Sequence, residues 1–325
     1  MTTAFVTGAS GFIGGSLTRR IVDDGWTVRA LARTQASTDA VTQAGAEPVR
    51  GDLSDVDALR LGARGCDVAF HAAAHVKDWD SREEFVRVNV DGTRNVIEAC
   101  RREGVRRLVF VGTEAALLTG KPLVEVNEDA PLQVESPSPY CATKAMAERA
   151  VLEANGDGLE TVVVRLRAVW GPGDRTILPA FVEAVRRGRF AWIGGGRHHT
   201  STTHVQNAVE GLVLGATAGR PGGIYFVTDR ERSVFREFIE GLLATQGVAA
   251  PNRSIPVWMA NASAVAAEAV WLTFRLRGAP PLTRTTLWLT SLECTIDISR
   301  AEKELGYRPR KSVAEGMAEL RPGSP

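Results

Sequence analysis

Short apolar runs alternate with amphipathic segments along the first half of the chain. Runs of consecutive apolar residues, several of them β-branched, predict strands covered on both faces at residues 4–7, 27–32, 48–50, 68–71, 107–111, 161–166 and 223–228. Between them, Ile13, Leu17 and Ile21 repeat at four-residue intervals and predict a helix, and further helices are predicted at 81–102 and from Pro139. Strands that alternate with helices predict an α/β fold, a Rossmann-type doubly wound parallel sheet.

The regular alternation fades after about residue 166. Loops rich in glycine and proline, at 171–173, 194–196 and 221–223, separate shorter elements. We interpret residues 1–228 as a dinucleotide-binding core that carries an insertion for the substrate region at about 168–200. Residues 229–325 are then a smaller, mostly helical substrate-binding region. Because open parallel sheets bind ligands at the carboxyl edge of their strands, this region is expected to cap that edge.

Composition and charge exclude several classes of protein. The 325 residues are 44% hydrophobic and 24% charged, which excludes wholesale disorder, and the formal charge of +1 gives no reason to expect a nucleic acid partner. The four cysteines form no CxxC pair and the chain opens without a secretory signal, so reduced thiols and a cytoplasmic location are expected. His198, His199 and His204 cluster without the spacing of a metal site, so no metal is expected.

A glycine-rich loop follows the first predicted strand and opens the first predicted helix. Its residues Gly8, Ser10, Gly11, Phe12, Ile13 and Gly14 are expected to bind the cofactor. Glycines at this spacing let the backbone turn sharply and approach a pyrophosphate, which then faces the helix N-terminus. A plain strand–turn–helix connection would also use glycines, but the strand before the loop and the helix after it favour phosphate binding.

The end of the second strand indicates which dinucleotide binds. NAD sites usually place an acidic residue there to hold the ribose 2′-hydroxyl, whereas this chain has Ala32 followed by Arg33, with Arg29 on the same strand. A guanidinium pairs with a 2′-phosphate, so NADP(H) is expected, with NAD(H) less favoured and a merely surface-exposed Arg33 as the alternative. Residues after the third and fourth strands are expected to line the adenine and ribose pocket: Asp52, which could instead cap a helix, with Leu53, His71, Ala72 and Ala73.

Tyr140 and Lys144 form the candidate catalytic pair. On a helix, residues four apart share a face, so the phenol and the ammonium can lie at one site. A tyrosine ordinarily has a pKa of about 10, and a neighbouring cation joined by an oxidised nicotinamide favours the phenolate and makes acid–base chemistry accessible. Such a spacing is common by chance, but it becomes specific when it is combined with the glycine loop.

These motifs together resemble the extended short-chain dehydrogenase/reductase family, in the NAD-dependent epimerase/dehydratase superfamily. The resemblance rests on the glycine loop, the His-Ala-Ala-Ala segment at 71–74 and the Tyr-Cys-Ala-Thr-Lys segment at 140–144, and later landmarks extend it over nearly the whole chain. It implies Tyr140 as acid/base, Lys144 on the nicotinamide ribose and Thr113 as the donor to the substrate carbonyl. Asn89 matches an asparagine that supports the family's site, and a purely structural role for it is at least as well supported.

Departures from the family patterns narrow the substrate. Dehydratases of nucleotide sugars carry adjacent Asp and Glu after the Thr, where this chain has Glu114 and Ala115, and epimerases carry an Asn where this chain has Ala168. Trp170 replaces a family Tyr two residues later. The Pro-Pro-Leu-Thr-Arg segment at 280–284 is similar to the 3β-hydroxysteroid dehydrogenase branch, which acts on apolar ketones. We therefore expect Glu114 and Trp170 to contact an apolar substrate.

The apolar segment at 255–274 is the remaining candidate for the substrate site. It contains Trp258 and Trp271, with Asn261 and Glu268 as its strongly polar residues. We expect it to form a pocket wall with both tryptophans at the substrate; a helix packed on the core and a helix at a membrane surface are the alternatives, the latter not favoured. An interior Glu and many alanines make a spanning helix improbable.

The sequence thus predicts an NADP(H)-dependent oxidoreductase that interconverts a secondary alcohol and a ketone on a small, mainly apolar substrate, steroid-like or 3-oxoacyl-like, with Tyr140 as acid/base. A nucleotide-sugar epimerase or dehydratase, and a non-catalytic NADP-sensing protein on the same fold, are the alternatives. A homodimer is compatible with the sequence, which does not define the oligomeric state.

Overall fold

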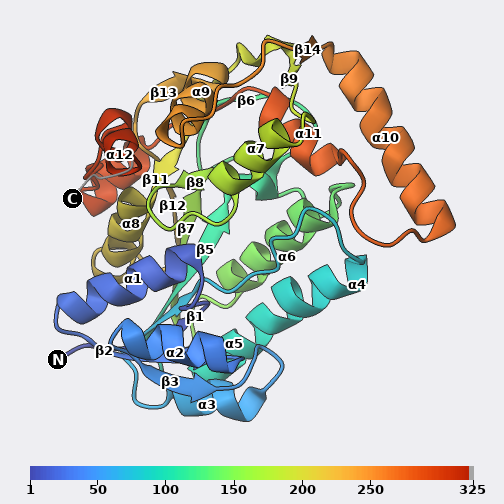
Figure 1. Cartoon of the computed structure of the whole chain (residues 1–325). Coiled ribbons are helices and arrows are strands. Elements are labelled where there is room, and N and C mark those ends of the chain that lie inside the picture. The colour runs from blue at the N-terminus through green and yellow to red at the C-terminus, as the bar shows by residue number, and fades with distance from the viewer. Residues whose placement is uncertain (322–325) are drawn as a thin grey trace.

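A seven-stranded parallel sheet forms the centre of the molecule, in the order β12-β7-β5-β4-β1-β2-β3 (Figure 1). The computed structural model describes residues 1–321. The strands are β1 (Thr3–Thr7), β2 (Thr27–Ala32), β3 (Glu47–Arg50), β4 (Val68–His71), β5 (Arg107–Thr113), β7 (Glu160–Leu166) and β12 (Gly223–Val227). All seven predicted strands are present, and the order reverses direction beside β1, where doubly wound sheets bind dinucleotides.

Helices cover both faces of this sheet, as the alternating pattern predicts. The helices α1 (Phe12–Asp23), α2 (Gln35–Gln43) and α8 (Val205–Thr217) pack on one face, and α3 (Val56–Ala63), α5 (Gly92–Arg102) and α6 (Pro139–Glu153) pack on the other. The central strands β1, β4, β5 and β7 are almost entirely buried, which explains their continuous apolar runs, whereas the edge strand β3 is mostly exposed.

The helix predicted at 81–102 is interrupted. It consists of α4 (Arg82–Phe85), a π-helical stretch at Val86–Asp91 and then α5. The wider turn brings Asn89 inside, where its side chain donates to the hydroxyl of Thr143 at 3.2 Å and accepts from the amide of His75 at 2.7 Å. Asn89 therefore ties the loop after β4 to helix α6, which carries Tyr140.

The remainder of the chain contains more strand than the sequence predicts. A mixed four-stranded sheet in the order β13-β10-β15-β6 joins β13 (Arg232–Val234), β10 (His199–Ser201), β15 (Cys294–Ile296) and β6 (Leu123–Val126). The expectation of a mostly helical region is therefore only partly met, because these strands are three or four residues long and carry little periodicity. The last four residues of the region predicted at 229–325 lie outside the described residues.

Short strand pairs and five helices complete the substrate side. The pairs are β8 (Val169–Trp170) with β11 (Thr203–His204), and β9 (Trp192–Ile193) with β14 (Ser254–Ile255). The helices are α7 (Ile177–Arg186), α9 (Phe235–Thr245), α10 (Val257–Phe274), α11 (Arg284–Ser291) and α12 (Val313–Glu319), with 3₁₀ turns at Glu114–Leu117 and Gly194–Gly196 and a π turn at Ala301–Leu305. Helix α10 projects from the body at the right of Figure 1 and packs on α11.

Candidate active site

A cavity of about 1030 Å³ lies along the carboxyl edge of the large sheet. One end is bounded by the loop between β1 and α1, the middle by the ends of β5 and β7 and the start of α6, and the other end by α7, β9 and α9. A cavity of this volume can hold a dinucleotide together with a second small molecule, and its position is that of the ligand crevice of doubly wound sheets.

The glycine loop fits a closely approaching pyrophosphate. Gly8 has φ of +76°, and a Cβ there would lie 2.6 Å from the backbone nitrogen of Ala73. A Cβ on Gly14 would lie 2.2 Å from the carbonyl oxygen of Gly8. Gly11 is the N-cap of α1 and supplies no side-chain hydrogen bond, so the amides of the first turn are left for a ligand. All six predicted loop residues line the cavity.

The adenosine end of the cavity carries a cation. Arg33 lines it directly before Thr34, the N-cap of α2, and forms no ion pair with any residue of the described part of the chain. Arg29, by contrast, lies 3.4 Å from the carboxylate of Glu47 and donates to the carbonyl of Arg64, outside the cavity. Thr34 and Ser37 also line this end and were not predicted, since neither belongs to a motif.

Of the residues predicted after β3 and β4 to bind the cofactor, all but His71 line the cavity. Asp52, Leu53, Ala72 and Ala73 line the cavity. Asp52 does not cap α3, because Asp55 does so; the hydroxyl and amide of Ser54 donate to the Asp52 carboxylate and lower its pKa.

His71 differs from the expectation that it lines the cofactor pocket. It is buried under the sheet edge, where Nδ1 lies 2.7 Å from the hydroxyl of Thr7 and Nε2 lies 2.9 Å from the hydroxyl of Thr93. Burial, and secondarily the charge of Lys144, lower its pKa to about 3, so the imidazole is neutral. Its bonds hold β1, β4 and α5 together beneath the cofactor loop.

The three predicted catalytic residues line the middle of the cavity together. Thr113 ends β5, and Tyr140 and Lys144 lie in the first turns of α6, which Ser138 caps. The Lys144 ammonium donates to the carbonyl of Val111 at 2.9 Å and lies over the ring of Phe110. Two elements, β5 and α6, thus present one hydroxyl, one phenol and one ammonium to the same space, from residues up to 31 positions apart in sequence.

Burial acts on both members of the Tyr–Lys pair. It raises the pKa of Tyr140, and the neighbouring carboxylate of Glu114 raises it further, while the Thr113 hydroxyl lowers it. Burial also lowers the pKa of Lys144 to about 8, although the carboxylate of Glu148 acts in the opposite direction. In the protein by itself the phenol is therefore protonated at neutral pH, rather than shifted toward phenolate.

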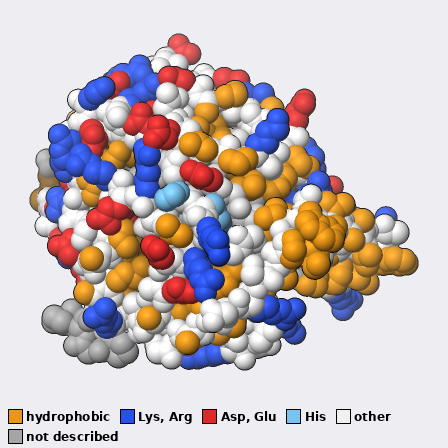
Figure 2. Space-filling model, turned by 90° about the horizontal axis from the view of Figure 1, so that it is seen from above, with side chains coloured by type: hydrophobic (Ala, Val, Ile, Leu, Met, Phe, Trp, Pro, Cys, Tyr) orange, Lys and Arg blue, Asp and Glu red, His pale blue; other side chains and the backbone are white. Residues whose placement is uncertain are grey.

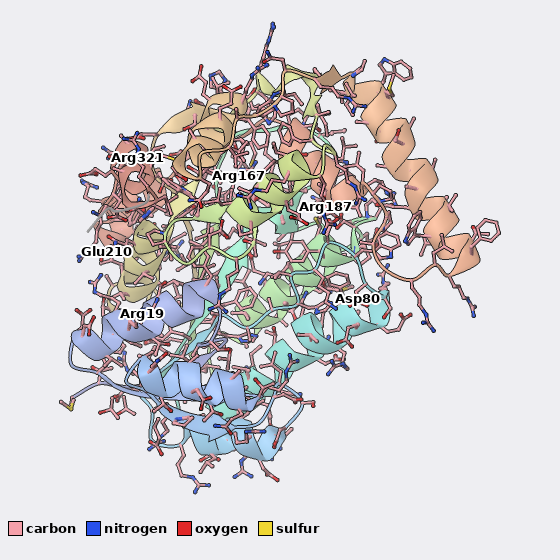
Figure 3. The ribbon with its side chains drawn as sticks, in the orientation of Figure 1. Arg19, Asp80, Arg167, Arg187, Glu210 and Arg321 are labelled. Carbon is pink, nitrogen blue, oxygen red and sulfur yellow. The ribbon has the colours of Figure 1, made fainter. Side chains whose placement is uncertain are left out.

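A buried polar network adjoins Thr113. Its hydroxyl donates to one oxygen of Glu114 at 2.7 Å, and Arg167 donates to the other at 2.6 Å. Arg167, labelled near the centre of the molecule in Figure 3, also contacts the hydroxyl of Thr200. Glu114 lines the cavity as predicted; Arg167 and Thr200 line it too and were not predicted, since no motif singles them out.

The far end of the cavity is an apolar chamber. Its walls come from α7, β9 and α9, and its lining includes Ile177, Phe181, Phe190, Trp192, Phe235 and Phe238. The rings pack edge to face, as Phe190 does against Trp192 with centroids 4.8 Å apart. Arg189, in the loop between α7 and β9, also lines this end of the cavity, whereas the lining residues of α7, β9 and α9 carry no charge. The sequence placed the substrate insertion at about 168–200 but did not single out these aromatic residues.

The three predicted substrate tryptophans do not line the cavity. Trp170 is fully buried behind it, with its indole NH donating to Asp229 at 2.8 Å and its ring against His204. Trp258 is 71% exposed, and Trp271 is partly covered elsewhere on α10. No residue of 255–274 lines the cavity, so this segment is not the pocket wall that its composition suggested.

The sheet, the glycine cradle and the Tyr–Lys pair at one cavity define an NAD(P)-dependent oxidoreductase that acts on a CH–OH or C=O group. Residues 5–257 match the sequence model of the 3-beta hydroxysteroid dehydrogenase/isomerase family, and the chain belongs to this family. The family lies within the extended short-chain dehydrogenase/reductase and epimerase/dehydratase superfamily, which confirms the resemblance.

Two similar proteins of known activity cover almost the whole chain. One is 4-hydroxy-2-methyl-3-oxo-4-farnesyl-3,4-dihydroquinoline-1-oxide ketoreductase of Stigmatella aurantiaca, 42% identical over 99% of this chain and 96% of that protein. The other is 2-alkyl-3-oxoalkanoate reductase of Stenotrophomonas maltophilia, 36% identical over 98% of each.

Solved structures share the same architecture. The crystal structure of gox2253 has a TM-score of 0.78 and 26% identity, covering 98% of both chains. The UDP-glucuronic acid 4-epimerase of Bacillus cereus, in complex with NAD, has a TM-score of 0.76 and 20% identity over 98% of this chain and 97% of that one. The second likeness concerns the fold alone.

Proposed function

We propose that the protein is an NADP(H)-dependent ketoreductase that reduces a ketone on a small, mainly apolar substrate. The observation that carries the proposal is the single cavity, in which the cofactor loop, the Tyr–Lys pair and an aromatic chamber follow one another. Two similar proteins are named as reductases of a ketone or of a 3-oxoalkanoate with an alkyl branch, which supports both the reaction and the apolar character.

The cofactor end supplies the groups that the proposed dinucleotide needs. The uncapped amides of α1 would hold the pyrophosphate, Arg33 would pair with the 2′-phosphate and Lys144 would donate to the nicotinamide ribose. When bound, the reduced nicotinamide supplies the hydride.

Tyr140 is the proposed proton donor to the carbonyl oxygen. Reduction consumes a proton, so the acid must start as the neutral phenol, and burial together with Glu114 raises the pKa of Tyr140 and keeps it in that form. Thr113 is the proposed second donor to the carbonyl, and Glu114 competes for its one proton at 2.7 Å. The network of Glu114 and Arg167 therefore sets the orientation of Thr113.

The apolar chamber is the proposed site of the substrate's hydrocarbon part. A ketone carbon placed at Tyr140 leaves the rest of the molecule to extend toward Phe181, Trp192 and Phe238. Apart from Arg189, which lies in the loop between α7 and β9, the chamber walls are apolar. They would leave the hydroxyl groups of a sugar without hydrogen-bond partners, which disfavours the nucleotide-sugar alternative. An intact acid/base set disfavours the sensor alternative, since binding alone has no need of it.

The test is the rate of NADPH oxidation across a panel of ketones. We expect 2-alkyl-3-oxoalkanoates, cyclic apolar ketones and 3-oxosteroids to be reduced, and UDP- and dTDP-sugars to be inert as substrates. Turnover of a nucleotide sugar that exceeds turnover of every apolar ketone contradicts the proposal. We also propose a cytoplasmic location, supported by four cysteines that are all unpaired and buried.

A further inference from the structure

One charged residue lines the substrate end of the cavity. Arg189 lies in the loop between α7 and β9, and it lines the cavity together with aromatic residues such as Phe181 and Trp192. The cavity-lining residues of α7, β9 and α9 carry no charge. Reduction of a purely apolar ketone gives this guanidinium no role.

The backbone of Arg189 is fixed against the last turn of α7. Its amide donates to the carbonyl of Ala184 at 2.9 Å. Gly188 has φ of +64°, and its amide donates to the carbonyl of Val185, also at 2.9 Å. These two bonds form a Schellman motif, in which the residue at the place of Arg189 commonly packs an apolar side chain against the residue at the place of Ala184. Because Ala184 lines the cavity, the motif sets Arg189 on the cavity side of the helix, with a charged side chain where an apolar one is usual.

Helix α7 forms a wall between the cofactor loop and Arg189. A Cβ on Gly173, shortly before the helix, would lie 3.7 Å from the ring of Phe12 in the glycine loop. Four cavity-lining residues then follow along one side of the helix: Ile177, Ala180, Phe181 and Ala184. A helix of this length extends about 15 Å. Arg189 therefore stands at the end of the wall that is remote from the cofactor.

The guanidinium of Arg189 has no acidic partner. The neighbouring Arg187 pairs with Glu183 at 2.5 Å, and basic and acidic side chains are interspersed over the body of the molecule in Figure 2. Among the residues that the structure describes, none forms an ion pair or a hydrogen bond with the side chain of Arg189. Residues 184–209 contain no Asp or Glu. The charge is therefore available to an anion from outside the chain.

The exposure of Arg189 determines which part of a ligand it can bind. The residue is exposed although it lines the cavity, so it stands where the chamber opens to water. An anion at this opening keeps part of its hydration, whereas an anion among Phe181 and Trp192 would lose its hydration without gaining a partner. A ligand that fits both surroundings has an apolar body and an anionic end.

We propose that Arg189 binds an oxyanion at the end of the substrate that is remote from the ketone. The substrate is then an amphiphile, with its carbonyl at Tyr140, its hydrocarbon part in the apolar chamber and a carboxylate or phosphate at the guanidinium. This inference rests on the proposed function, which supplies the position of the carbonyl. The oxyanion has two possible sources, a carboxylate of the substrate itself and a phosphate of a thioester carrier such as coenzyme A.

Matched pairs of ketones test the proposal. The two members of a pair have the same apolar chain, which ends in a carboxylate in one and in a methyl ester in the other. We expect the wild type to prefer the acid at least about tenfold in kcat/KM, since a hydrogen bond to a charged group contributes about that factor. Arg189→Gln should lose this preference and reduce the ester as the wild type does. The change should lie in KM and not in kcat, because the remote anion is bound equally in the ground state and the transition state.

Two further variants separate the charge of Arg189 from its packing. Arg186→Gln is the matched control, because Arg186 is exposed in the last turn of α7 and does not line the cavity, so its loss should leave the preference for the acid unchanged. Arg189→Lys keeps the charge and should retain part of the preference. The preference of the wild type should also fall as salt is added, since the charge of an exposed residue is screened.

A thioester substrate distinguishes the two sources of the anion. If a carrier phosphate binds Arg189, Arg189→Gln should raise the KM for a 3-oxoacyl-coenzyme A more than the KM for the keto acid. If a carboxylate of the substrate binds there, the order of the two effects is reversed.

Either of two results overturns the proposal. One is a wild type that reduces ketones but does not distinguish acid, ester and thioester. The other is an Arg189→Gln variant in which acid and ester lose activity equally, which assigns Arg189 to the packing of the chamber.

A binding measurement separates this inference from failure of the proposed function. Calorimetric titration of a saturated fatty acid, in the presence of NADP⁺, does not depend on turnover of any ketone. We expect Arg189→Gln to weaken this binding about tenfold and Arg186→Gln to leave it unchanged. Equal binding to the wild type and to Arg189→Gln contradicts the inference even if no ketone is reduced.

Discussion

The two ends of the cavity differ in the atoms that line them, backbone at one end and aromatic side chains at the other. The cofactor end is mostly backbone: Gly8 and Gly14 lie where a Cβ would collide with main-chain atoms, and the first amides of α1 have no side-chain cap. The substrate end consists of aromatic side chains from three elements, with Phe181, Trp192 and Phe238 among them. The first end tolerates little change and recognises a fixed shape, whereas the second presents a surface whose extent decides which substrate fits.

The largest expected effect is at the junction of the two ends. Tyr140→Phe should lower kcat by two to four orders of magnitude, because it removes the proton donor and leaves the ring in place. Cofactor binding at one end and substrate binding at the other should be unchanged, as measured by fluorescence titration. Near wild-type turnover in this variant would show that a group other than Tyr140 donates the proton.

The next effect concerns stability, through the buried His71 beneath the cofactor loop. The pKa of His71 is lowered from 6.5 to about 3, so the unfolded chain binds a proton below pH 6.5 that the folded protein refuses. Stability should therefore fall on acidification, by roughly 2 kcal/mol between pH 7 and pH 5 from this group.

His71→Gln, which retains a donor and an acceptor but does not titrate, should remove this part of the pH dependence. Urea unfolding at the two pH values measures it. Equal losses of stability in the variant and the wild type would show that other groups cause the acid sensitivity.

A third test measures whether the cofactor end distinguishes NADPH from NADH by the 2′-phosphate. NADPH should bind at least about tenfold better than NADH, a difference of about 1.4 kcal/mol, and Arg33→Asp should erase or reverse it. Arg29→Gln is the control, because Arg29 on β2 pairs with Glu47 on the neighbouring strand β3, and its loss should leave the preference intact. Equal affinities for both cofactors in the wild type would show that Arg33 is a surface residue that does not bind the 2′-phosphate.

The smallest effect, per step, lies in the apolar chamber. Each methylene added to a ketone should improve kcat/KM by up to about 0.8 kcal/mol until the chamber is full. Phe181→Ala should lower this gain, because the added methylenes then contact fewer atoms, while Trp258→Ala on the exposed face of α10 should not. If Trp258→Ala changes the dependence on chain length and Phe181→Ala does not, the substrate binds at residues 255–274, as the sequence first predicted.

The cofactor end and the parallel sheet could be predicted from sequence because their signals are local. Gly8 to Gly14 follow one strand and open one helix, and Arg33 follows the next strand directly, so neighbours in sequence are neighbours at the site. Tyr140 and Lys144 are one helical turn apart for the same reason. Thr113 needed the family resemblance, since an isolated threonine at the end of a strand carries no pattern.

The substrate end could not be predicted because its residues converge only through tertiary packing. Trp192 and Phe238 are 46 residues apart, on a two-residue strand and a helix that the pattern does not connect. Apolar composition alone also led to the wrong helix being predicted as the pocket wall. Helix α7 carries Glu183 and Arg186 on one side and presents its apolar side to the cavity. Helix α10 has no such polar side and lies on the outside of the molecule. Trp170 was misassigned because its indole partner, Asp229, is distant in sequence.

The start of the catalytic helix depends on a residue made late in synthesis. Ser138, the N-cap of α6, shares a buried hydrogen bond of 2.6 Å with the hydroxyl of Thr285 on α11. Chains fold from the N-terminus as they emerge from the ribosome, and the sheet through β7 can form before residue 285 exists. A nascent chain of that length has the dinucleotide fold but lacks the partner that fixes the helix of Tyr140. Reductase activity is therefore expected to appear only after α11 has been translated.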